Sequence, residues 1–580
     1  MPDKILVLDG DMTPALAVVR SLGRLGLVVD VASPVPEGIA TYSRHCHTTL
    51  VYPDPLTRET EFLAWCADLL ARNAYRLILP VTERTVVPLQ ALLSRPGGES
   101  ITIAAPEALA VALDKDRTLA LAAQLGIAAP RSVQVNDLSE LDQASQGLSL
   151  PLVLKPARSI GADGTERRQL SVAYAFSPRE LHDKAEHFLR YGPLLLQEYV
   201  AGVGVGIELI ADRGEIVFAF QHQRLHEVPL TGGGSSLRKS VAVEPELLEA
   251  SRKLMAALKW HGVAMVEFKW IPAERRLSLM EINGRFWGSL PLAIAAGADF
   301  PAMLYELYTQ DKVKPRPPAR QEVYCRKLSS DLYWHEMVLR RDGPPELVTF
   351  PGKGSMLRDA LRVFSPRHYF DVQQWRDPKP GLVDLARIWQ EQTDRIRRLL
   401  ADKKERQAQR QAWQGGEVAR RLSRAHQILF VCYGNINRSA LAERCFQQRH
   451  PDTGVKAFSA GFHEESGRPA DPVMVEVAGQ ARVDMQHWAS RRLDAAMLAD
   501  SDIVFVMEQK HLQRLRQEFP LAADKAFLMN AGPLVGGSLE IPDPYGKARE
   551  VYERVCHQVS RCVDAIATHL AEPTDKSRRP

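Results

Sequence analysis

The sequence predicts a multidomain protein of mixed α/β and α+β class. We expect a parallel α/β domain first, an α+β domain after it, and a last α/β domain with a central parallel sheet. The 580 residues suffice for about three or four domains at roughly 100 to 200 residues each. Short apolar runs alternate with amphipathic stretches near both ends of the chain, which is typical of parallel sheets. Several runs between residues 150 and 300 alternate apolar with polar positions, which favours antiparallel strands.

The composition, with 45% hydrophobic and 25% charged residues, is that of an ordinary soluble protein and excludes disordered, fibrous and disulfide-rich classes. The formal net charge of +4 is too small over this length to indicate a nucleic-acid partner. No signal-like segment opens the sequence, and no apolar run reaches the roughly 18 residues of a membrane span. The seven cysteines are scattered, without a CxxC pair or zinc-site spacing. We therefore expect a cytoplasmic protein without a membrane span.

The first domain is predicted over residues 1–100. A strand at 5–8 is followed by a helix at 15–25 and by strands at 28–32 and 77–79. This order is typical of a parallel sheet with helical crossovers. The absence of a GxGxxG sequence disfavours a nicotinamide-binding Rossmann domain.

Changes in composition divide the rest of the chain into five parts. We predict an α+β domain at residues 101–312, an extension of it at 313–385, a charged linker at 386–425, a last α/β domain at 426–572 and a polar tail at 573–580. The strands of the α+β domain are predicted at residues 152–155, 194–200, 206–211, 216–221, 264–270 and 277–282. The linker is helical in composition and interrupted by Gly415 and Gly416. Its interspersed acidic residues and thin apolar face favour a solvated helix over one lying on a membrane surface.

A short motif after the predicted strand at 428–431 carries the chemistry of the last domain. Cys432 opens a tight loop that ends with Arg438 and Ser439 at the start of a helix. Such a loop aims backbone N–H groups at one point and creates an anion site, which the helix dipole reinforces. The same field favours a nucleophilic thiolate at Cys432, the Arg438 guanidinium can bind two phosphoryl oxygens, and Ser439 can donate its hydroxyl to the sulfur. The alternative is a buried structural cysteine followed by a surface arginine.

Asp543 supplies a candidate proton donor for the same chemistry. It lies between Pro542 and Pro544 in a loop that presents its carboxylate to solvent. Cleavage of a phosphomonoester requires a proton for the leaving oxygen, and a loop aspartate over the anion site can donate it. An Asp-Pro turn by itself is common.

Together these motifs resemble the low-molecular-weight protein tyrosine phosphatase family over roughly residues 428–570. Further motifs follow in the expected order: Ser459-Ala460-Gly461, Gly467-x-Pro469-Ala470-Asp471-Pro472 and Asp502-Ile503-Val504-Phe505-Val506-Met507-Glu508. The resemblance implies that Cys432 is a nucleophile forming a phosphocysteine, that Arg438 clamps the transition state, and that Asp543 is general acid and then base. It also implies a phosphate-binding loop, organised by Asn435 and Ser439 and completed by Tyr433, Gly434, Ile436 and Asn437. The substrate would be a phosphomonoester or a phosphoprotein.

The chain departs from the family pattern at two places. Asn437 stands where many relatives have a second cysteine, so a protective disulfide with Cys432 cannot form there. The segment after Ser459-Ala460-Gly461, which would line the groove of the site, carries Glu464 and Glu465. These two carboxylates would repel a phosphate dianion unless they face away, so the sequence leaves open whether phosphotyrosine is the substrate. The arsenate reductases that share this fold need further thiols.

A second group of candidate functional residues lies on a predicted antiparallel hairpin with its turn around residues 272–276. Strand alternation places Glu281 and Asn283 on one face, with Arg285 beside them if the strand persists and Glu267 across the hairpin. Two carboxylates and an amide oxygen suit Mg²⁺ or Mn²⁺ with nucleotide phosphates, and Arg285 could stabilise a phosphoryl group in transfer. The alternative is a solvated face with salt bridges, but the apolar neighbours of the carboxylates indicate buried strands.

This hairpin and weaker motifs before it resemble the ATP-grasp ligase family over roughly residues 1–310. The weaker motifs are a lysine after Asp114, a strand-end lysine followed by a turn at 159–165, and a strand-like run at 195–200. The resemblance implies that ATP phosphates contact Lys115 and Lys155, that adenine is held by Glu198, Tyr199 and Val200, and that Glu267, Glu281 and Asn283 carry magnesium. The usual ribose-binding glutamate is not evident, and Glu208 is a possible substitute.

The ATP-grasp resemblance implies a ligase in which ATP phosphorylates a small-molecule carboxylate and an amine or thiol attacks the acyl phosphate. A glycine-rich stretch at 231–236 could be a mobile loop over the acceptor or an unstructured surface loop. We therefore interpret the chain as a fusion of a ligase and a phosphatase. Two alternatives stay open: a phosphatase regulated by an ATP-sensing half without turnover, and an adaptor that recognises phosphate without hydrolysis. The sequence leaves the oligomeric state open.

Overall fold

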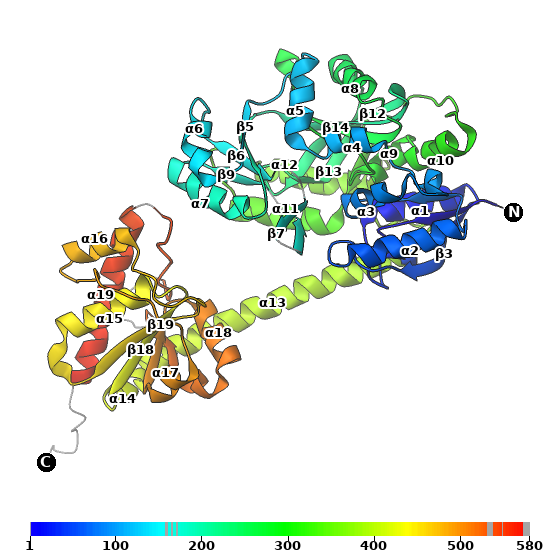
Figure 1. Ribbon diagram of the computed structural model, residues 1–580. Helices are drawn as coiled ribbons and strands as arrows, with labels where there is room; N and C mark the ends of the chain where they lie inside the picture. The colour runs from blue at the N-terminus through cyan, green and yellow to red at the C-terminus, as the bar shows by residue number, and fades with distance from the viewer. Residues whose placement is uncertain are drawn as a thin grey trace. The chain divides into compact units, whose positions relative to one another are not determined.

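The computed structural model describes residues 2–156, 160–163, 166–169, 172–530, 538–547 and 549–571. Two compact units, Met1–Gln390 and Glu391–Pro580, make up the chain, and their boundary falls within the helix α13 (Pro378–Gln414) (Figure 1). The tail predicted at 573–580 lies outside the described residues. Among the helices that are described, none is both long and apolar enough to cross a membrane.

The first unit opens with a parallel sheet of strand order β3-β2-β1-β4. Its elements are β1 (Lys4–Val7), α1 (Thr13–Arg24), β2 (Val28–Ser33), β3 (Cys46–Val51), α2 (Glu59–Ala71), β4 (Leu77–Leu79) and α3 (Glu83–Leu89). Ile5, Leu6 and Val7 are fully buried, as expected for strands covered on both faces. The predicted order of strand, helix and strand is confirmed.

Two short helices, α4 (Pro106–Ala112) and α5 (Lys115–Gln124), divide the next helical stretch of the chain. The division occurs at Asp114, whose carboxylate accepts hydrogen bonds from the backbone N–H groups of Asp116 and Arg117. Aspartate is a strong N-cap, and its side chain restarts the helix here.

A four-stranded antiparallel sheet of order β5-β10-β6-β9 comes next. Its elements are β5 (Ser132–Val135), α6 (Leu141–Ser145), β6 (Leu152–Pro156), β9 (Ala173–Ala175), α7 (Pro178–Leu189) and β10 (Leu194–Glu198). Between β6 and β9 lies a hairpin of β7 (Ile160–Asp163) and β8 (Glu166–Gln169). Three residues of the turn predicted at 159–165, namely Ser159, Gly164 and Thr165, lie outside the described residues.

The largest sheet has seven strands in the order β15-β14-β11-β12-β13-β16-β17. These are β11 (Val203–Asp212), β12 (Glu215–Val228), β13 (Gly234–Val241), β14 (Gly262–Ile271), β15 (Arg276–Asn283), β16 (Tyr324–Arg326) and β17 (His368–Phe370). All neighbours are antiparallel except β16 and β17. The helices of this region are α8 (Pro245–Ala257), α9 (Leu290–Ala296), α10 (Phe300–Gln310), α11 (Leu328–Arg340) and α12 (Lys353–Leu361).

The loop predicted at 231–236 is wrong for its second half, because Gly234, Ser235 and Ser236 begin β13 and pair with the end of β12. Serine and glycine are poor strand formers on their own, and cross-strand pairing with β12 decides the structure here.

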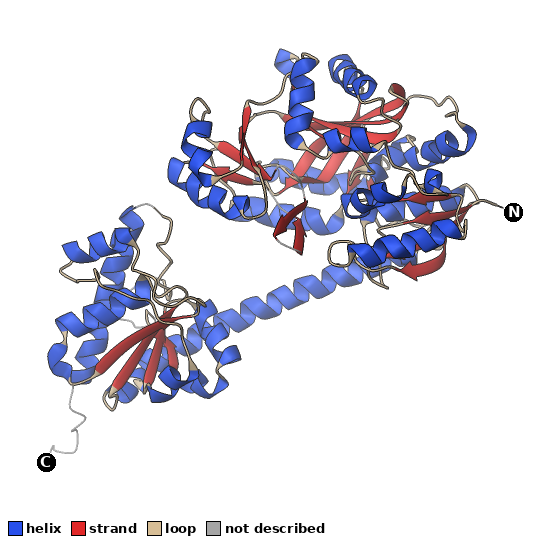
Figure 2. Ribbon diagram, in the orientation of Figure 1, coloured by secondary structure: helices blue, strands red, loops and turns tan. Residues whose placement is uncertain are grey.

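The second unit contains a parallel sheet of order β19-β18-β20-β21 with helices on both sides (Figure 2). Its elements after α13 are α14 (Glu417–Leu422), β18 (Gln427–Cys432), α15 (Arg438–Arg449), β19 (Lys456–Gly461), α16 (Pro472–Gln480), α17 (Ala495–Asp500), β20 (Ile503–Val506), α18 (Gln509–Glu518), β21 (Ala526–Leu528) and α19 (Arg549–Ala571). The predicted fold class is therefore confirmed at all three levels: parallel α/β, α+β, and a last α/β domain around a parallel sheet.

Candidate active sites

The Cys432 loop connects the end of β18 to the start of α15, as the sequence predicts. Cys432 is 2% exposed, and its Sγ lies 2.9 Å from Ser439 Oγ and 3.2 Å from the backbone N of Asn435. A hydroxyl and an N–H that both reach the sulfur can stabilise a thiolate. The loop therefore has the donor geometry that a nucleophilic cysteine requires.

Asn435 holds the loop in shape. Its backbone lies in the left-handed region, with φ of 52°. Its side-chain Nδ2 donates to Ser439 Oγ and Ser459 Oγ, and its Oδ1 accepts from the backbone N of Arg491. These bonds fix a backbone conformation that is uncommon for residues other than glycine.

Neighbouring segments press closely on the same loop. A Cβ atom at Gly461 would lie 2.5 Å from the carbonyl oxygen of Tyr433, so glycine is needed where β19 passes the loop. Arg468 Nη2 donates to the carbonyl of Gly434 at 2.6 Å. The carbonyl of Ile436 accepts from the backbone N of Asp471, and Asn437 Nδ2 donates to the Asp471 carboxylate.

Arg438, the first residue of α15, is 1% exposed and lies among acceptors. Its Nη1 is 2.5 Å from Glu508 Oε2 and donates to the carbonyl of Ile541, while its Nη2 is 2.8 Å from Asp543 Oδ2. Burial by itself raises the pKa of Glu508, but the hydrogen bond and the charge of Arg438, together with Lys510, outweigh burial and the pKa of Glu508 is lowered. The structure thus brings the predicted clamp and the predicted proton donor into direct contact, with Asp543 still partly exposed.

The predicted hairpin is present as β14 and β15, and Glu267 pairs directly with Glu281. Asn283 Nδ2 lies 3.2 Å from Glu267 Oε1 and 3.2 Å from Glu281 Oε1. The three predicted metal ligands therefore converge. Within the described residues no group of three or more His, Cys, Asp or Glu could hold a metal ion, so any site here relies on two carboxylates and one amide.

Cations balance these buried carboxylates. Arg224, on β12, reaches Glu267 Oε2 at 2.5 Å and Glu227 Oε1 at 3.3 Å, and donates to the carbonyl of Gly233. Burial raises the pKa of Glu267. It would also raise that of Glu281, but the charges of Lys115 and Lys155 lower the pKa of Glu281 overall.

Lys155 is the second predicted phosphate contact and sits at the end of β6. Burial lowers its pKa to about 8, against the opposite pull of Glu281. Lys115 also acts electrostatically on Lys155 and on Glu281. The two lysines and the hairpin carboxylates are therefore close enough to act on one another's charge.

The predicted adenine segment, Glu198 to Val200, follows β10. Arg131 holds the Glu198 carboxylate through Nη2 at 2.6 Å and Nε at 2.9 Å, and the backbone N of Ser149 donates to it as well. These hydrogen bonds, led by that of Arg131, lower the pKa of Glu198 to about 2. The ring of Tyr199 packs edge-on against Tyr174. The side chain of Glu198 is thus occupied by protein groups.

Glu208, the possible ribose contact, is fully buried on β11. Its Oε1 lies 2.9 Å from His222 Nδ1 and accepts from Ser289 Oγ. The structure places this carboxylate among protein partners.

Arg285 does not share the face of Glu281, because β15 ends at Asn283. Its Nη2 lies 3.2 Å from Glu83 Oε1 at the start of α3. The condition for its predicted place, that the strand persists, is therefore not met, and Arg285 is held by the first sheet's helix.

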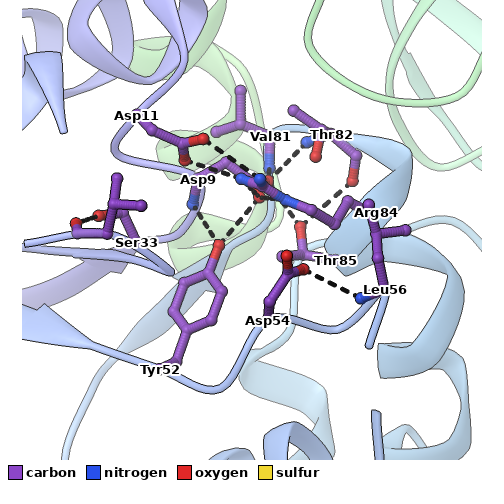
Figure 3. A network of polar contacts seen from close by, with 11 residues as sticks. Asp9, Asp11, Ser33, Tyr52, Asp54, Leu56, Val81, Thr82, Arg84 and Thr85 are labelled. Atoms are coloured by element: carbon purple, nitrogen blue, oxygen red, sulfur yellow. Dashed lines mark hydrogen bonds and ion pairs between the residues drawn. The ribbon is translucent and has the colours of Figure 1, made fainter. Parts of the chain in front are cut away.

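The residue after Glu83 belongs to a network that sequence reasoning missed (Figure 3). Arg84 Nη2 lies 2.9 Å from Asp9 Oδ1 and 2.7 Å from Asp11 Oδ1. Asp9 also accepts from Tyr52 Oη, Thr85 Oγ1 and the backbone N of Thr82. The network ties the loop after β1 to the helix that holds Arg285.

Comparison with known proteins finds two family matches. Residues 427–576 match the sequence model of a family described as low molecular weight phosphotyrosine protein phosphatase. The low molecular weight protein-tyrosine-phosphatase Wzb of Escherichia coli (strain K12) is 35% identical over 128 residues, which cover 22% of this chain and 84% of Wzb. The phosphatase Etp of the same strain is 35% identical over 144 residues, which cover 25% of this chain and 94% of Etp.

Through these residues the chain belongs to the low molecular weight protein-tyrosine-phosphatase family. Residues 190–330 match a second family model, described as ATP-grasp in the biosynthetic pathway with Ter operon. A solved ADP complex of purK, N5-carboxyaminoimidazole ribonucleotide synthetase, is 14% identical with a TM-score of 0.46, over 56% of this chain and 81% of that chain. An ATP-grasp domain and a phosphatase domain are both present, and the two predicted resemblances are confirmed.

The mouth of the phosphatase site is aromatic and charged. The half-exposed ring of Tyr433 lies edge-on to His463, whose backbone N donates to the Tyr433 carbonyl. The Arg514 guanidinium lies over the ring of Phe462. Glu464 and Glu465, which the sequence indicates as a possible repulsive wall, are both exposed.

The seven cysteines, all within the part of the chain that the structure describes, are free thiols. Cys445, Cys556 and Cys562 are buried in α15 and α19, two helices that pack on one another. Burial raises the pKa of all three thiols, to about 11 for Cys445 and about 12 for Cys562. Buried thiols of this kind are inert, which disfavours the arsenate-reductase alternative.

Sequence reasoning assigned no role to three residues that contact the sites. Glu508 is 70 residues from Arg438, Arg224 is 43 residues from Glu267, and Arg468 is 34 residues from Gly434. Glu508 stands in a quoted family motif, which was the one available signal. The contacts of the two arginines depend on strand pairing and loop packing that no local pattern reports.

Proposed function

We propose that the chain is a bifunctional enzyme. The first unit is an ATP- and Mg²⁺-dependent ligase that activates a carboxylate as an acyl phosphate for attack by an amine or thiol. The second unit is a cysteine-dependent phosphatase that acts through a phosphocysteine. The phosphatase assignment rests on the ion pair of Arg438 with Asp543. In the same loop, Ser439 Oγ and the backbone N of Asn435 contact the Cys432 sulfur.

In the phosphatase reaction the Cys432 thiolate attacks phosphorus, and the S–P bond forms as the bond from phosphorus to the leaving oxygen breaks. Asp543 gives its proton to the leaving oxygen. Arg438 and the N–H groups of the loop hold the phosphoryl oxygens. Asp543, now ionised, takes a proton from a water molecule that attacks the phosphocysteine. Phosphate leaves, and the thiolate is restored.

Support for the ligase assignment comes from the convergence of Glu267, Glu281 and Asn283 on one face. Their oxygen atoms are the donors that Mg²⁺ prefers, and Mn²⁺ would also fit. When bound there, the metal ion would compensate the charge of the nucleotide phosphates. Lys155 and Lys115 place positive charge close enough to lower the pKa of Glu281, which suits them to nucleotide phosphates beside the metal ion. Once Glu267 binds a cation, Arg224 no longer pairs with it, and the Arg224 guanidinium is free to attract an anionic substrate.

The test measures both activities on one preparation of the full chain. ADP release is followed with Mg²⁺ and ATP against panels of carboxylates combined with amines or thiols, and aryl phosphate hydrolysis is followed in parallel. We expect ADP release that depends on both a carboxylate and a nucleophile, and aryl phosphate hydrolysis that vanadate inhibits. ATP binding without ADP release from any pair would favour an ATP-sensing half. Phosphate binding without hydrolysis would favour an adaptor.

A further inference from the structure

A series of hydrogen bonds connects the loop that carries Asp543 with the phosphate-binding loop. The backbone N of Gly546, three residues after Asp543, donates to Tyr552 Oη at 3.2 Å. Tyr552 Oη in turn donates to Asp471 Oδ2 at 2.6 Å. The same carboxylate oxygen accepts from Nδ2 of Asn437, a residue of the phosphate-binding loop, at 3.3 Å. We call these four residues, Gly546, Tyr552, Asp471 and Asn437, the Tyr552 network.

The side chains of the Tyr552 network are buried. Tyr552 is fully buried, and Asn437 and Asp471 are 3% and 7% exposed. Hydrogen bonds that share a group strengthen one another where the dielectric constant is low. The other carboxylate oxygen of Asp471 accepts from the backbone N of Val473 and caps α16. Asp471 is therefore fixed at a helix start and gives Tyr552 and Asn437 a common, well-held partner.

The surrounding helices and turn fix both ends of the network. Tyr552 lies in the first turn of α19, which packs on α15 and α16. The turn that contains Gly546 is closed by a hydrogen bond of 2.9 Å from the backbone N of Lys547 to the carbonyl of Pro544. Gly546 itself has a φ of 70°, in the left-handed region that glycine adopts without strain. The N–H that Tyr552 accepts from is thus held at a set distance along the loop from Asp543.

The ion pair with Arg438 also holds Asp543, but it cannot last through the proposed reaction. Arg438 has to bind phosphoryl oxygens once the substrate is present, and Asp543 has to carry a proton in order to donate it. A protonated carboxyl group no longer attracts a guanidinium by charge. The bond from Gly546 to Tyr552 involves neither group, so it persists when the ion pair is broken.

We propose that Tyr552 is a positioning residue for the general acid, and that it keeps Asp543 over the leaving oxygen during proton transfer. It does so by holding Gly546 on one side and by its bond to Asp471, which Asn437 shares, on the other. The proposal deepens the proposed phosphatase function and rests on Asp543 being its general acid. A network that served stability alone would affect all leaving groups equally.

The variant Y552F tests the proposal, because it removes the hydroxyl and keeps the buried ring. We compare kcat/KM of the full-length chain for an alkyl phosphate, which has a poor leaving group, and for a nitrophenyl phosphate, which has a good one. Only the poor leaving group needs the proton, so kcat/KM should fall about tenfold for the alkyl phosphate and less than about twofold for the nitrophenyl phosphate. Vanadate should inhibit as in the parent, because the phosphate-binding loop and Arg438 are unchanged.

The matched control is S501A, which also removes a buried, hydrogen-bonded hydroxyl. Ser501 is 4% exposed and donates to the carbonyl of Met497. It precedes β20, whereas Cys432 ends β18, and these two strands are parallel. Ser501 therefore lies at the opposite edge of the sheet from the Cys432 loop. S501A should leave the ratio of the two kcat/KM values unchanged, even where it lowers the unfolding temperature.

A double-mutant cycle with D543N separates positioning from general damage. The acid is absent in D543N, so adding Y552F should change kcat/KM for the alkyl phosphate by less than about twofold. An independent structural effect would instead multiply with that of D543N. Thermal unfolding of each variant verifies that the rates are those of folded protein.

If Y552F does not fold, D471A carries the test, because it removes the carboxylate to which Tyr552 donates. This variant also loses the N-cap of α16, so the control D494A removes the N-cap of α17 instead. D471A should lose activity selectively toward the alkyl phosphate, and D494A should not.

The outcomes separate this inference from the proposed function. Equal losses for both substrates in Y552F, or a full additional loss on the D543N background, would overturn the role of Tyr552 and leave the phosphatase assignment standing. A parent chain that hydrolyses neither phosphate would overturn the phosphatase function and the inference with it.

Discussion

Arg438 Nη2 lies 2.8 Å from Asp543 Oδ2, and Nη1 of the same guanidinium lies 2.5 Å from Glu508 Oε2. The phosphate clamp and the proposed general acid of the phosphatase are therefore joined by one ion-pair network. Because Arg438 is buried, removing either carboxylate leaves a charge with less compensation. Substitutions at the three positions should change binding and proton transfer in different proportions, which makes their roles separable.

The variant C432S should abolish hydrolysis of aryl phosphates. A serine hydroxyl in place of the thiolate is a far weaker nucleophile at neutral pH. The control is C46S, since Cys46 is a half-buried thiol of the first unit. Initial rates with an aryl phosphate decide the matter, and a serine variant as fast as the parent would show that the cysteine mechanism is wrong.

The variant D543N should slow poor leaving groups far more than good ones, because only poor leaving groups need a proton. The loss for an alkyl phosphate should be about 100-fold or more. Rates are compared across a series of phosphates with leaving groups of graded acidity, with E465Q on the exposed rim as the control. An equal loss across the series would remove Asp543 from the role of general acid.

The variant E508Q should lower kcat for aryl phosphates about tenfold while inorganic phosphate inhibits at least as well as before. Without its charge, residue 508 no longer neutralises Arg438, so Arg438 binds anions more readily. The Arg438 guanidinium is then also no longer held in place. The inhibition constant of phosphate and kcat are measured on the same preparation. Weaker phosphate inhibition with unchanged kcat would contradict this reading of Glu508 as a positioning residue.

The affinity for ATP should fall as pH rises through about 8. Burial lowers the pKa of Lys155 to about 8, so the ammonium that a phosphate needs is lost above that pH, by up to about tenfold per pH unit. The same shift makes the free energy of unfolding rise with pH between about 8 and the ordinary lysine pKa, because the unfolded chain then binds more protons.

Calorimetric titration of ATP at several pH values tests the Lys155 prediction. The control variant K155R carries a side chain that stays charged, and its ATP affinity should be independent of pH in this range. A parent affinity that is flat between about pH 7 and about pH 10 would contradict the assignment.

The variant E281Q should eliminate ADP formation and spare aryl phosphate hydrolysis. Removing one carboxylate from the set of Glu267, Glu281 and Asn283 weakens the proposed metal site and leaves triphosphate charge uncompensated. The exposed Glu274 at the hairpin turn offers the matched control E274Q. ADP release that survives in E281Q would refute the metal assignment, and a joint loss of both activities in folded protein would refute independent units.

Local patterns predicted much of both sites. Alternation along two strands joined by a tight turn was enough to bring Glu267, Glu281 and Asn283 together, because the hairpin register follows from the turn. The Cys432 loop was equally predictable, since a strand, a short loop and a helix start fix its donors within eight residues of sequence. Arg285 was misplaced because β15 ends at Asn283, a strand end that tertiary contacts decide.

The sequence by itself determined the two chemistries, an anion loop around a cysteine and an oxygen-rich hairpin, because each lies within one stretch of local structure. The tertiary structure decided which charges meet them: Glu508 and Asp543 at Arg438, Arg224 at Glu267, and Glu83 at Arg285. It also placed the Tyr552 hydroxyl between Gly546 and Asp471. The physical reason is that spacing along the chain sets which residues share a face, whereas partners from distant segments meet only when sheets, helices and loops pack.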